Sequence, residues 1–379
     1  MKFVANSTVL LSHLQAISRV INAKNTWQIL DNFLFDLNGK QLTMTATDME
    51  TTLITHMEVE EAEGSGKVAV ASRLLLETLR EFSDQPLTFD INDSNLAMVI
   101  TSANGFYNFI GQNGDEYPLL PEIEADAQEM TLPVDTLEAG VNKTLFSAAD
   151  DELRPIMNGV YFDIVSDSLT LVATDAHKLV RYKTSYTDAK LTDEAEGASF
   201  VLPKKPANML KSILPKESGD VVVRFDRKNA HFQLSNYTMI CRQVEGKFPN
   251  YNAVIPQESP YKVIVDRLSL LNALRRVSVF SNQANNLVKL DIADNKIVMS
   301  AQDIDFSISA EETIDCQFAE KGIKIGFKSV FLIEILNNIP SDEVIIGLID
   351  SSRAAIILPF ENKENEEILM LLMPMLLND

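Results

Sequence analysis

Three segments of the chain carry apolar residues at the spacing of an amphipathic helix, each after a polar residue that can cap a helix N-terminus. The predicted caps are Asn6 with Ser7, Asp135, and Asp266. The apolar positions behind them are Leu10, Leu14, Ile17 and Ile21, then Leu137, Val141 and Leu145, then Leu270, Leu274 and Val277. The three predicted helices start at intervals of roughly a third of the 379-residue chain, which indicates an internal repeat.

Alternating β-rich runs follow each predicted helix and are broken by Asn, Gly or Asp turn residues, a pattern typical of hairpins. These runs read NFLFDLNGKQLTMTAT from Asn32, GVYFDIVSDSLTLVAT from Gly159 and LVKLDIADNKIVMSA from Leu287. A second helix is predicted in each third, SRLLLETLREF from Ser72, KPANMLKSIL from Lys205 and KSVFLIEILNNI from Lys328. More strands follow, such as VVVRF from Val221 and EVIIGLI from Glu343. The repeated unit is therefore helix, strands, helix, strands.

Each β-rich run ends on a shared phrase with an aspartate just after a predicted strand. The phrase reads LTMTATDMETTL around Asp48, LTLVATDAHKLVRY around Asp175 and IVMSAQDIDFSI around Asp303. Only the middle copy has a histidine, His177, two residues further on. Because aspartate is the repeated feature and commonly bonds its own backbone in turns, we interpret Asp175 as a turn residue. The alternative is a three-domain hydrolase in which Asp175 and His177 perform acid–base catalysis.

The length of 379 residues predicts more than one hydrophobic core and fits three repeats of an α+β unit. Two Pro-bearing polar segments, LPEIEADAQEMTLP from Leu120 and NAVIPQESP from Asn252, are typical of linkers between domains. We therefore place the domains at 1–125, 126–255 and 256–379.

Composition and spacing predict a protein without a cofactor or metal. No apolar run approaches the ~18 residues of a membrane span, and no cleavage-site pattern follows the N-terminus, so a cytoplasmic location is expected. Cys241 and Cys316 lie outside any zinc-binding spacing and are expected to be buried. GSGKVAV from Gly64 lacks the glycine and the Ser or Thr of a phosphate loop, since Glu61 and Val68 occupy those positions. We expect it to be a hairpin turn, and we predict no catalytic residue.

The net charge of −21 argues against tight binding of nucleic acid, because phosphate contacts depend on cations. The basic residues nevertheless recur at predicted helices and helix ends. Solvated helix faces carry such residues too. The threefold repeat favours a functional role for them.

Four phrases in order, ATDAHKLV, GKFPNYNAVIP, IGFKSVFLIEIL and LLMPML, resemble the bacterial DNA polymerase III beta subunit, the sliding clamp, over the whole chain. The resemblance implies three domains of the DNA clamp fold, each with two helices packed on antiparallel sheets, in a head-to-tail homodimer that closes into a ring. Such a ring encircles double-stranded DNA without sequence preference, with helices lining the hole and sheets outside. It tethers the replicative polymerase and other repair and replication proteins, is placed on DNA by a clamp loader, and performs no chemistry. A ring held on DNA by topology tolerates the negative charge.

The resemblance also assigns site residues. The partner-peptide pocket would use Met157, Thr174, His177, Lys178, Leu179, Pro249, Val254, Phe331, Ser352, Met373, Pro374 and Met375. The dimer interface would join Val279 and Phe280 to Tyr107 and Phe109. The DNA-facing cations would be Lys24, Arg73, Arg80, Lys143, Arg154, Lys205 and Lys211.

The chain departs from the family's phrases at three places. Ala176 replaces the usual glycine, Ala253 replaces a usual arginine, and LLND replaces a terminal Arg-Leu. These departures concern the peptide preference of the pocket. Independently of them, a peptide-binding scaffold that does not encircle DNA is a further alternative to the clamp and the hydrolase.

Overall fold

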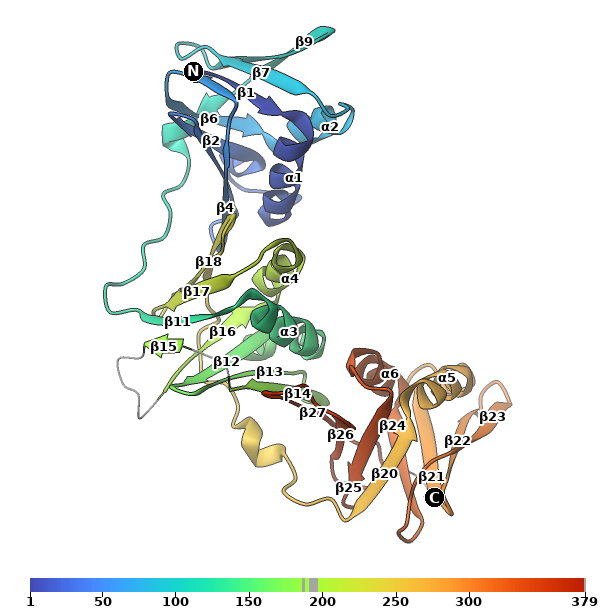
Figure 1. The fold of residues 1–379 in the computed structure, drawn as a ribbon. Helices are drawn as coiled ribbons and strands as arrows, with labels where there is room; N and C mark the ends of the chain where they lie inside the picture. Colours follow the sequence, from blue (N-terminus) through green and yellow to red (C-terminus); the bar gives the residue numbers. More distant parts are fainter. Residues whose placement is uncertain (186–187, 191–196, 378–379) are drawn as a thin grey trace. The chain divides into compact units, whose positions relative to one another are not determined.

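The computed structural model describes residues 1–185, 188–190 and 197–377, so Asn378 and Asp379 of the LLND ending lie outside the described residues. The chain forms two compact units. The first unit comprises residues 1–138, 188–194 and 205–243, and the second comprises 139–187, 195–204 and 244–379. The division falls inside the middle third, which contributes strands to both units (Figure 1).

The first unit contains two antiparallel sheets. One has five strands in the order β5 (Glu61–Glu63), β1 (Lys2–Asn6), β7 (Pro86–Ile91), β8 (Ala97–Ser102) and β9 (Gly105–Ile110). The other has ten, in the order β10 (Gln112–Asn113), β6 (Gly66–Ala71), β2 (Asn32–Asn38), β3 (Gln41–Thr47), β4 (Thr51–Glu58), β19 (Tyr237–Arg242), β18 (Asn229–Gln233), β17 (Asp220–Phe225), β11 (Gln128–Pro133) and β15 (Asp188–Lys190). The β4–β19 pairing, from Thr55 opposite Tyr237 to Thr51 opposite Cys241, joins the first third to the middle third.

The second unit repeats this arrangement. Its eight-stranded sheet has the order β16 (Ala198–Pro203), β12 (Gly159–Val165), β13 (Ser168–Thr174), β14 (Lys178–Thr184), β27 (Glu366–Leu372), β26 (Ala355–Pro359), β25 (Glu343–Leu348) and β20 (Tyr261–Asp266). Its four-stranded sheet has the order β23 (Ile308–Asp315), β22 (Lys296–Asp303), β21 (Leu287–Ala293) and β24 (Ile323–Lys328). The β14–β27 pairing, from Lys178 opposite Leu372 to Thr184 opposite Glu366, joins the middle third to the last third.

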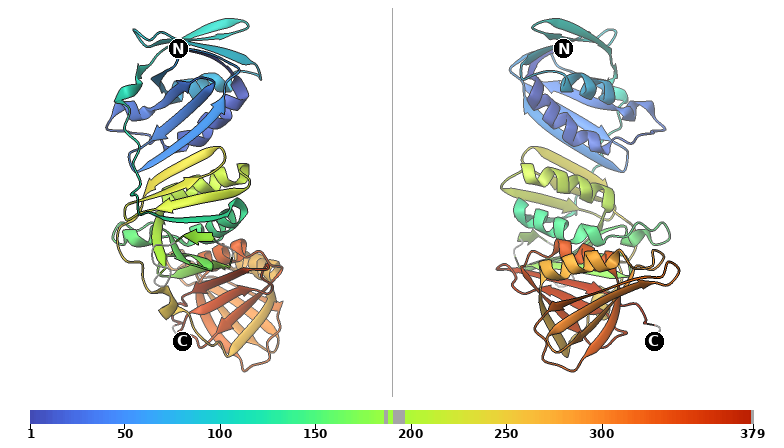
Figure 2. Two further views of the ribbon diagram at one scale, coloured as in Figure 1. Left: turned by 60° about the vertical axis from the view of Figure 1, so that its left-hand side comes forward. Right: turned by 90° about the vertical axis from the view of Figure 1, so that its right-hand side faces the viewer.

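Helices cover these sheets in pairs. In the first unit, α1 (Ser7–Ile17) contacts α2 (Ser72–Arg80), and in the second, α5 (Arg267–Ser278) contacts α6 (Ser329–Asn338) (Figure 2). The middle third supplies α3 (Val134–Thr144) and α4 (Lys204–Ile213). The predicted apolar faces of α1 and α5 are buried, since Leu10, Leu14, Leu270 and Leu274 are inaccessible to solvent. All three predicted hairpins are present.

Two of the three predicted helix caps are confirmed. The Asn6 side chain accepts hydrogen bonds from Thr8 N at 3.0 Å and Val9 N at 3.1 Å, and Asp266 accepts one from Ser269 N at 2.7 Å. The prediction for Asp135 was wrong, because α3 begins at Val134 and Asp135 lies within the first turn. There its negative charge still interacts favourably with the helix dipole.

Two smaller predictions were also wrong. The Gly64 segment is not a hairpin turn, because β5 pairs with β1 and β6 pairs with β2, so the segment crosses between two sheets. Gly64 has a φ of 74°, which suits glycine at this crossing. Cys316 is only half-buried, whereas Cys241 is buried, and burial raises the pKa of the Cys241 thiol.

Within the described ranges, no helix is long and apolar enough to cross a membrane. The same part of the chain contains no group of three or more His, Cys, Asp or Glu side chains placed to hold a metal ion.

Candidate partner-binding site and charged surfaces

The repeated aspartates are turn residues in all three thirds, as predicted. One oxygen of each side chain accepts hydrogen bonds from two backbone N–H groups a few residues ahead. For Asp175 the donors are His177 N at 2.9 Å and Lys178 N at 2.8 Å. These bonds close a tight turn between β13 and β14, next to the strand that pairs with the last third.

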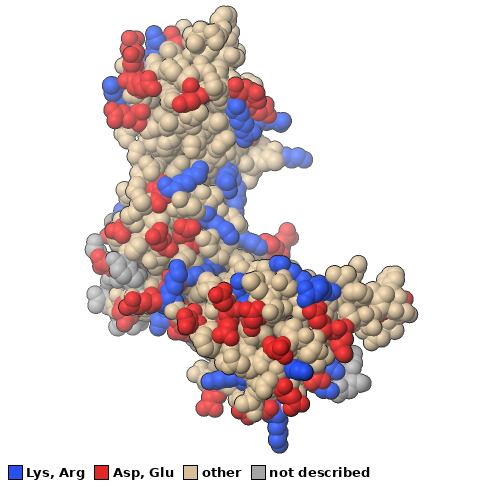
Figure 3. Space-filling view, turned by 45° about the vertical axis from the view of Figure 1, so that its right-hand side comes forward, with Lys and Arg blue, Asp and Glu red and all other residues tan. Residues whose placement is uncertain are grey.

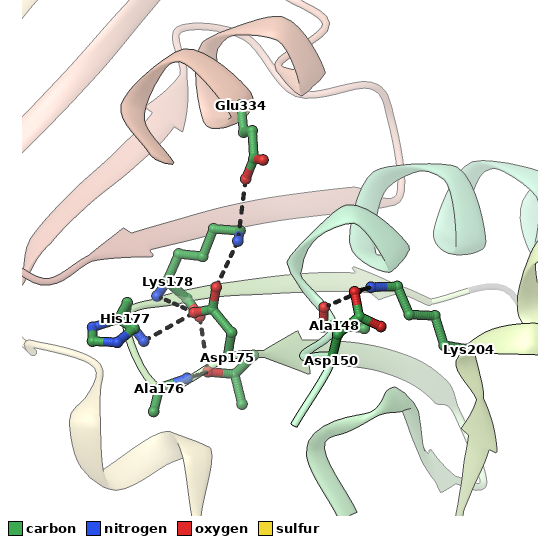
Figure 4. A network of polar contacts seen from close by, with 9 residues as sticks. Ala148, Asp150, Asp175, Ala176, His177, Lys178, Lys204 and Glu334 are labelled. Carbon is green, nitrogen blue, oxygen red and sulfur yellow. Dashed lines mark hydrogen bonds and ion pairs between the residues drawn. The ribbon is translucent and has the colours of Figure 1, made fainter. Parts of the chain in front are cut away.

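The second oxygen of Asp175 binds a buried lysine. Lys178 Nζ lies 2.6 Å from Asp175 Oδ2 and 3.1 Å from Glu334 Oε2 on α6, and its side chain is only 5% exposed (Figure 4). The same ammonium lies 4.5 Å from the centre of the Phe331 ring. A charge so far removed from water needs such partners. Lys178 therefore ties the turn of the middle third to a helix of the last third.

This network does not form an acid–base pair. Both oxygens of Asp175 are already used, one by backbone N–H groups and the other by Lys178. The His177 ring is exposed and stacks on Phe331, with ring centres 5.7 Å apart. Nothing in this arrangement orients His177 as a base, which disfavours the hydrolase hypothesis.

A buried apolar cluster lies beside the turn. It includes Leu179, Phe248, Tyr251, Ile356 and Leu371, with Ile156 and Ile255 packed against it. The Phe248 ring stacks on Tyr161 at 4.5 Å, and the Tyr251 hydroxyl donates to Asp163 at 2.8 Å. Of these residues, only Leu179 was predicted from the sequence. Phe248 and Tyr251 belong to the GKFPNYNAVIP phrase, so their aromatic character within that phrase was the available signal.

The LLMPML phrase, residues 371–376, is bonded to the turn at one end. Met373 N donates to His177 O at 2.8 Å, and Met375 N donates to Gly326 O at 2.8 Å. These bonds place the LLMPML phrase beside ATDAHKLV, although the two are about half the chain apart in sequence. The structure thus brings together two of the four diagnostic phrases.

All twelve predicted pocket residues belong to the second unit, but they differ in exposure. Exposed members are His177, Pro249, Val254, Ser352 and Met373; half-buried members are Met157, Phe331, Pro374 and Met375; buried members are Thr174, Lys178 and Leu179. Thr174 Oγ1 donates to Lys178 O at 2.8 Å and accepts from Ala176 N at 3.1 Å. Thr174 and Lys178 are therefore buried and stabilise the turn through hydrogen bonds. Of the three polar residues predicted at this turn, only His177 is exposed to a partner.

Ala176 occupies an unusual backbone conformation. Its φ is 73°, in the left-handed region that favours glycine, and Met49 at the matching place in the first third has a φ of 78°. Such residues cost of order 1 kcal/mol and persist only where the surroundings impose the geometry. The paired bonds to Asp175 and Thr174 supply that constraint around Ala176.

Removing the Asp175 carboxylate should lower stability without abolishing the site. We expect Asp175→Ala to reduce the unfolding free energy by about 2–3 kcal/mol at pH 7, because it leaves buried Lys178 with Glu334 alone. His177→Ala should cost little stability, since that ring is exposed. Thermal or urea unfolding of both variants measures the difference, and equal stabilities would refute the structural role of Asp175.

The pH dependence of this effect has a defined sign. Burial raises the pKa of Asp175, but hydrogen bonds from Lys178 and His177 lower it further, and the net pKa lies below its ordinary value. The carboxylate therefore stabilises the fold at neutral pH, and this stabilisation is lost as the pH falls through the folded-state pKa. The stability gap between wild type and Asp175→Ala should narrow accordingly in acid.

The predicted DNA-facing cations fall into two groups. Lys143 lies 2.5 Å from Glu366 and Lys205 pairs with Asp48, while Arg73 and Arg154 pair with nearby carboxylates on the surface. Within the described residues, Lys24, Arg80 and Lys211 are exposed and have no carboxylate partner. Basic and acidic side chains are interspersed over the face drawn in Figure 3. Lys143 and Lys205 are thus already neutralised and are poorer candidates for phosphate contacts.

The predicted dimer residues also differ in exposure. Val279, Phe280 and Tyr107 are exposed, but Phe109 is only 7% exposed and packs inside its own domain. On the same strand, β9, Phe106 is 71% exposed and Ile110 is 82% exposed. Phe106 and Ile110 were not predicted as interface residues, because the sequence GFYNFI places apolar side chains on both faces of the strand and does not show which face is exposed. Phe109 is therefore a core residue in this chain.

Three copies of one helix-and-sheet unit, joined strand to strand, with an apolar site where the second and third copies meet, define the DNA clamp class of proteins. Models of the DNA polymerase III beta subunit match this chain with the N-terminal domain at residues 1–121, the central domain at 131–250 and the C-terminal domain at 252–376. The chain belongs to the DNA polymerase III beta subunit family. It is a DNA sliding clamp of replication, a processivity factor without catalytic activity.

Individual relatives agree with this assignment. The chain is 26% identical to the beta sliding clamp of Vibrio cholerae over 374 residues, covering 99% of both proteins, and 28% identical to that of Synechococcus elongatus over 367 residues, covering 95% and 96%. A crystal structure of a DnaN sliding clamp from Bartonella birtlesii bound to griselimycin is 27% identical, with a TM-score of 0.91 and full coverage of both chains. The clamp from Pseudomonas aeruginosa, 23% identical with a TM-score of 0.92, shares the fold.

Proposed function

We propose that two copies of this chain form a head-to-tail ring that encircles duplex DNA and tethers the replicative polymerase. A clamp loader would place the ring on DNA in the cytoplasm, and other replication and repair proteins would use the same partner site. The domains would span 1–125, 126–255 and 256–379, close to the matched family regions. The observation that supports this proposal is a pair of sheet edges that have no pairing strand among the described residues and are flanked by exposed apolar side chains.

The first edge is β9 in the first unit, and the second is β23 in the second unit. Phe106 and Ile110 are exposed on β9. Ile304 and Phe306, just before β23, and Ile308, its first residue, are exposed as well. Unpaired edges with apolar side chains normally require a covering partner. Pairing β9 of one copy with β23 of the other makes a heterologous contact, and two such contacts close a ring.

The partner site would be the surface around the Asp175 turn. Val254, Phe331, Met373 and Met375 contribute accessible apolar area above the buried Leu179, and methionine adapts to several different ligands. His177 would provide a polar contact at the rim. We expect short extended peptides with glutamine, leucine and phenylalanine to bind with modest affinity, because ordering a flexible peptide offsets part of the gain from burial.

Encirclement predicts retention that depends on DNA topology. After loading, the protein should remain on a nicked circular plasmid at high salt, where phosphate contacts are weak. Cutting the plasmid once should release it, and blocking both ends of the linear DNA should restore retention. Gel filtration of the loaded DNA measures the bound fraction. Equal retention on circular and open-ended DNA would favour the peptide-binding scaffold instead.

A further inference from the structure

The only tryptophan of the chain, Trp27, is exposed. It lies between two short 3-10 helices, Ser18–Val20 and Gln28–Asp31, and its carbonyl accepts a hydrogen bond from Leu30 N at 3.1 Å. Its side chain is 57% exposed. Tryptophan is usually highly buried, since it carries the largest apolar surface of any side chain. An indole ring with this much exposed apolar surface suggests that it contacts a ligand.

The segment that carries Trp27 is firmly held. Lys205 Nζ donates to Val20 O at 3.0 Å and to Asn22 Oδ1 at 2.7 Å, and it pairs with the buried carboxylate of Asp48. Asn25 Nδ2 donates to Asp31 Oδ1 at 2.7 Å. Lys205 thus joins Val20 and Asn22 to the Asp48 turn, and the Asn25–Asp31 bond closes the loop that carries Trp27. A segment ordered in advance loses little entropy when it binds a ligand.

Three exposed charged residues lie near Trp27 in the sequence: the cations Arg19 and Lys24 and the carboxylate Asp31. Arg19 and Lys24 are exposed, and neither has a carboxylate partner among the residues that the structure describes. Asp31 accepts a hydrogen bond from Asn25 Nδ2, and Asp48 pairs with Lys205. Residues 19–31 thus carry two cations and one carboxylate, a small positive excess on a chain with a net charge of −21.

We propose that Trp27 stacks on an unpaired base of single-stranded DNA whose phosphates contact Lys24 and Arg19. Aromatic side chains beside cations are the recurrent means of binding single strands, because every base has a flat face on which an aromatic ring stacks. A duplex presents its phosphates but no free base faces. Trp27 would therefore recognise the single-stranded DNA next to a primer end. This inference rests on the proposed function, to which it adds a preferred DNA structure.

The test uses Trp27 as its own reporter. Because it is the sole tryptophan, the emission of the full chain reports on this position alone. Titration at low salt with a mixed-sequence single-stranded oligonucleotide should quench the emission strongly, and a blunt duplex of equal length should quench it little. Binding to fluorescently labelled oligonucleotides then measures affinity in the variants.

Trp27→Ala should weaken single-strand binding about tenfold, whereas Trp27→Phe should retain most of it. Lys24→Ala should weaken single-strand binding. It should also reduce the slope of log affinity against log salt concentration by about one, the value for one lost phosphate contact. Leu74→Ala is the matched control, because Leu74 is an exposed apolar residue on α2 of the same unit. It should bind single strands like the wild type.

Unchanged single-strand affinity in Trp27→Ala would overturn the inference, as would equal quenching by the blunt duplex. Retention of the wild type on circular DNA separates this result from the proposed function. If retention holds and quenching is absent, only the role of Trp27 fails. If quenching occurs and retention is lost, encirclement fails while the stacking contact stands.

Discussion

Replacing Val279 and Phe280 together with alanine should convert the proposed dimer to a monomer at low micromolar concentration. Both side chains follow the C-terminal end of α5, and Val279 is 74% exposed in the single chain. Burial of one such side chain contributes roughly 1.5–3 kcal/mol. Each of the two identical interfaces of a ring contains one Val279 and one Phe280, so the double substitution truncates four side chains per ring. The dissociation constant of the dimer should therefore rise by several orders of magnitude. Sedimentation or light scattering measures the solution mass.

Matched variants distinguish loss of the interface from loss of the fold. Leu268→Ala removes an exposed apolar side chain at the opposite end of α5 and should leave the dimer intact. Phe106→Ala with Ile110→Ala should also give monomers, because these residues flank the other edge. Phe109→Ala should instead lower the stability of the first unit, since its ring is buried. An unchanged mass for the Val279 and Phe280 variant would show that the interface lies elsewhere.

Deleting residues 373–379 should abolish binding of partner peptides and stimulation of the polymerase. The deletion removes Met373 and Met375 and their backbone bonds to His177 and Gly326, which place this segment against the Asp175 turn. The apolar wall on one side of the site is then lost. Strand β27 ends at Leu372, so its pairing with β14 and β26 remains. Fluorescence anisotropy of a labelled peptide measures the loss.

The dimer provides the control for this deletion, because the deleted residues belong to neither of the two predicted edge strands, β9 and β23. The truncated protein should keep its dimeric mass and its retention on circular DNA. Met373→Ala with Met375→Ala keeps the backbone bonds and should weaken peptide binding to a smaller extent. Wild-type peptide affinity in the truncated protein would place the partner site elsewhere on the chain.

Sequence and structure agree best where the determining interactions are local. The helix faces, the caps at Asn6 and Asp266 and the aspartate turns depend on residues within about one turn of one another, and their patterns are visible in the chain. The repeat was visible for the same reason. The error at Asp135 was small, because an acidic residue is favourable both at a cap and in the first helical turn.

Contacts between distant residues were not predictable from the pattern alone. The β4–β19 and β14–β27 pairings merge sheets of successive repeats, and nothing local specifies which strands pair. The direction in which Phe109 points follows from the register of β9, since successive side chains of a strand face opposite sides. Lys143, Lys178 and Lys205 each have a carboxylate partner far away in sequence, namely Glu366, Glu334 and Asp48. These partners decide whether each ammonium is free.

The sequence by itself therefore determined the repeated α+β unit, the turn role of Asp175 and, through four phrases, the family. Only the tertiary structure decided which predicted cations remain free, which apolar residues are exposed and which side chains surround the partner site. The physical reason is that secondary structure follows from neighbouring residues. Burial and ion pairing depend instead on strand register and on packing between segments far apart in the chain.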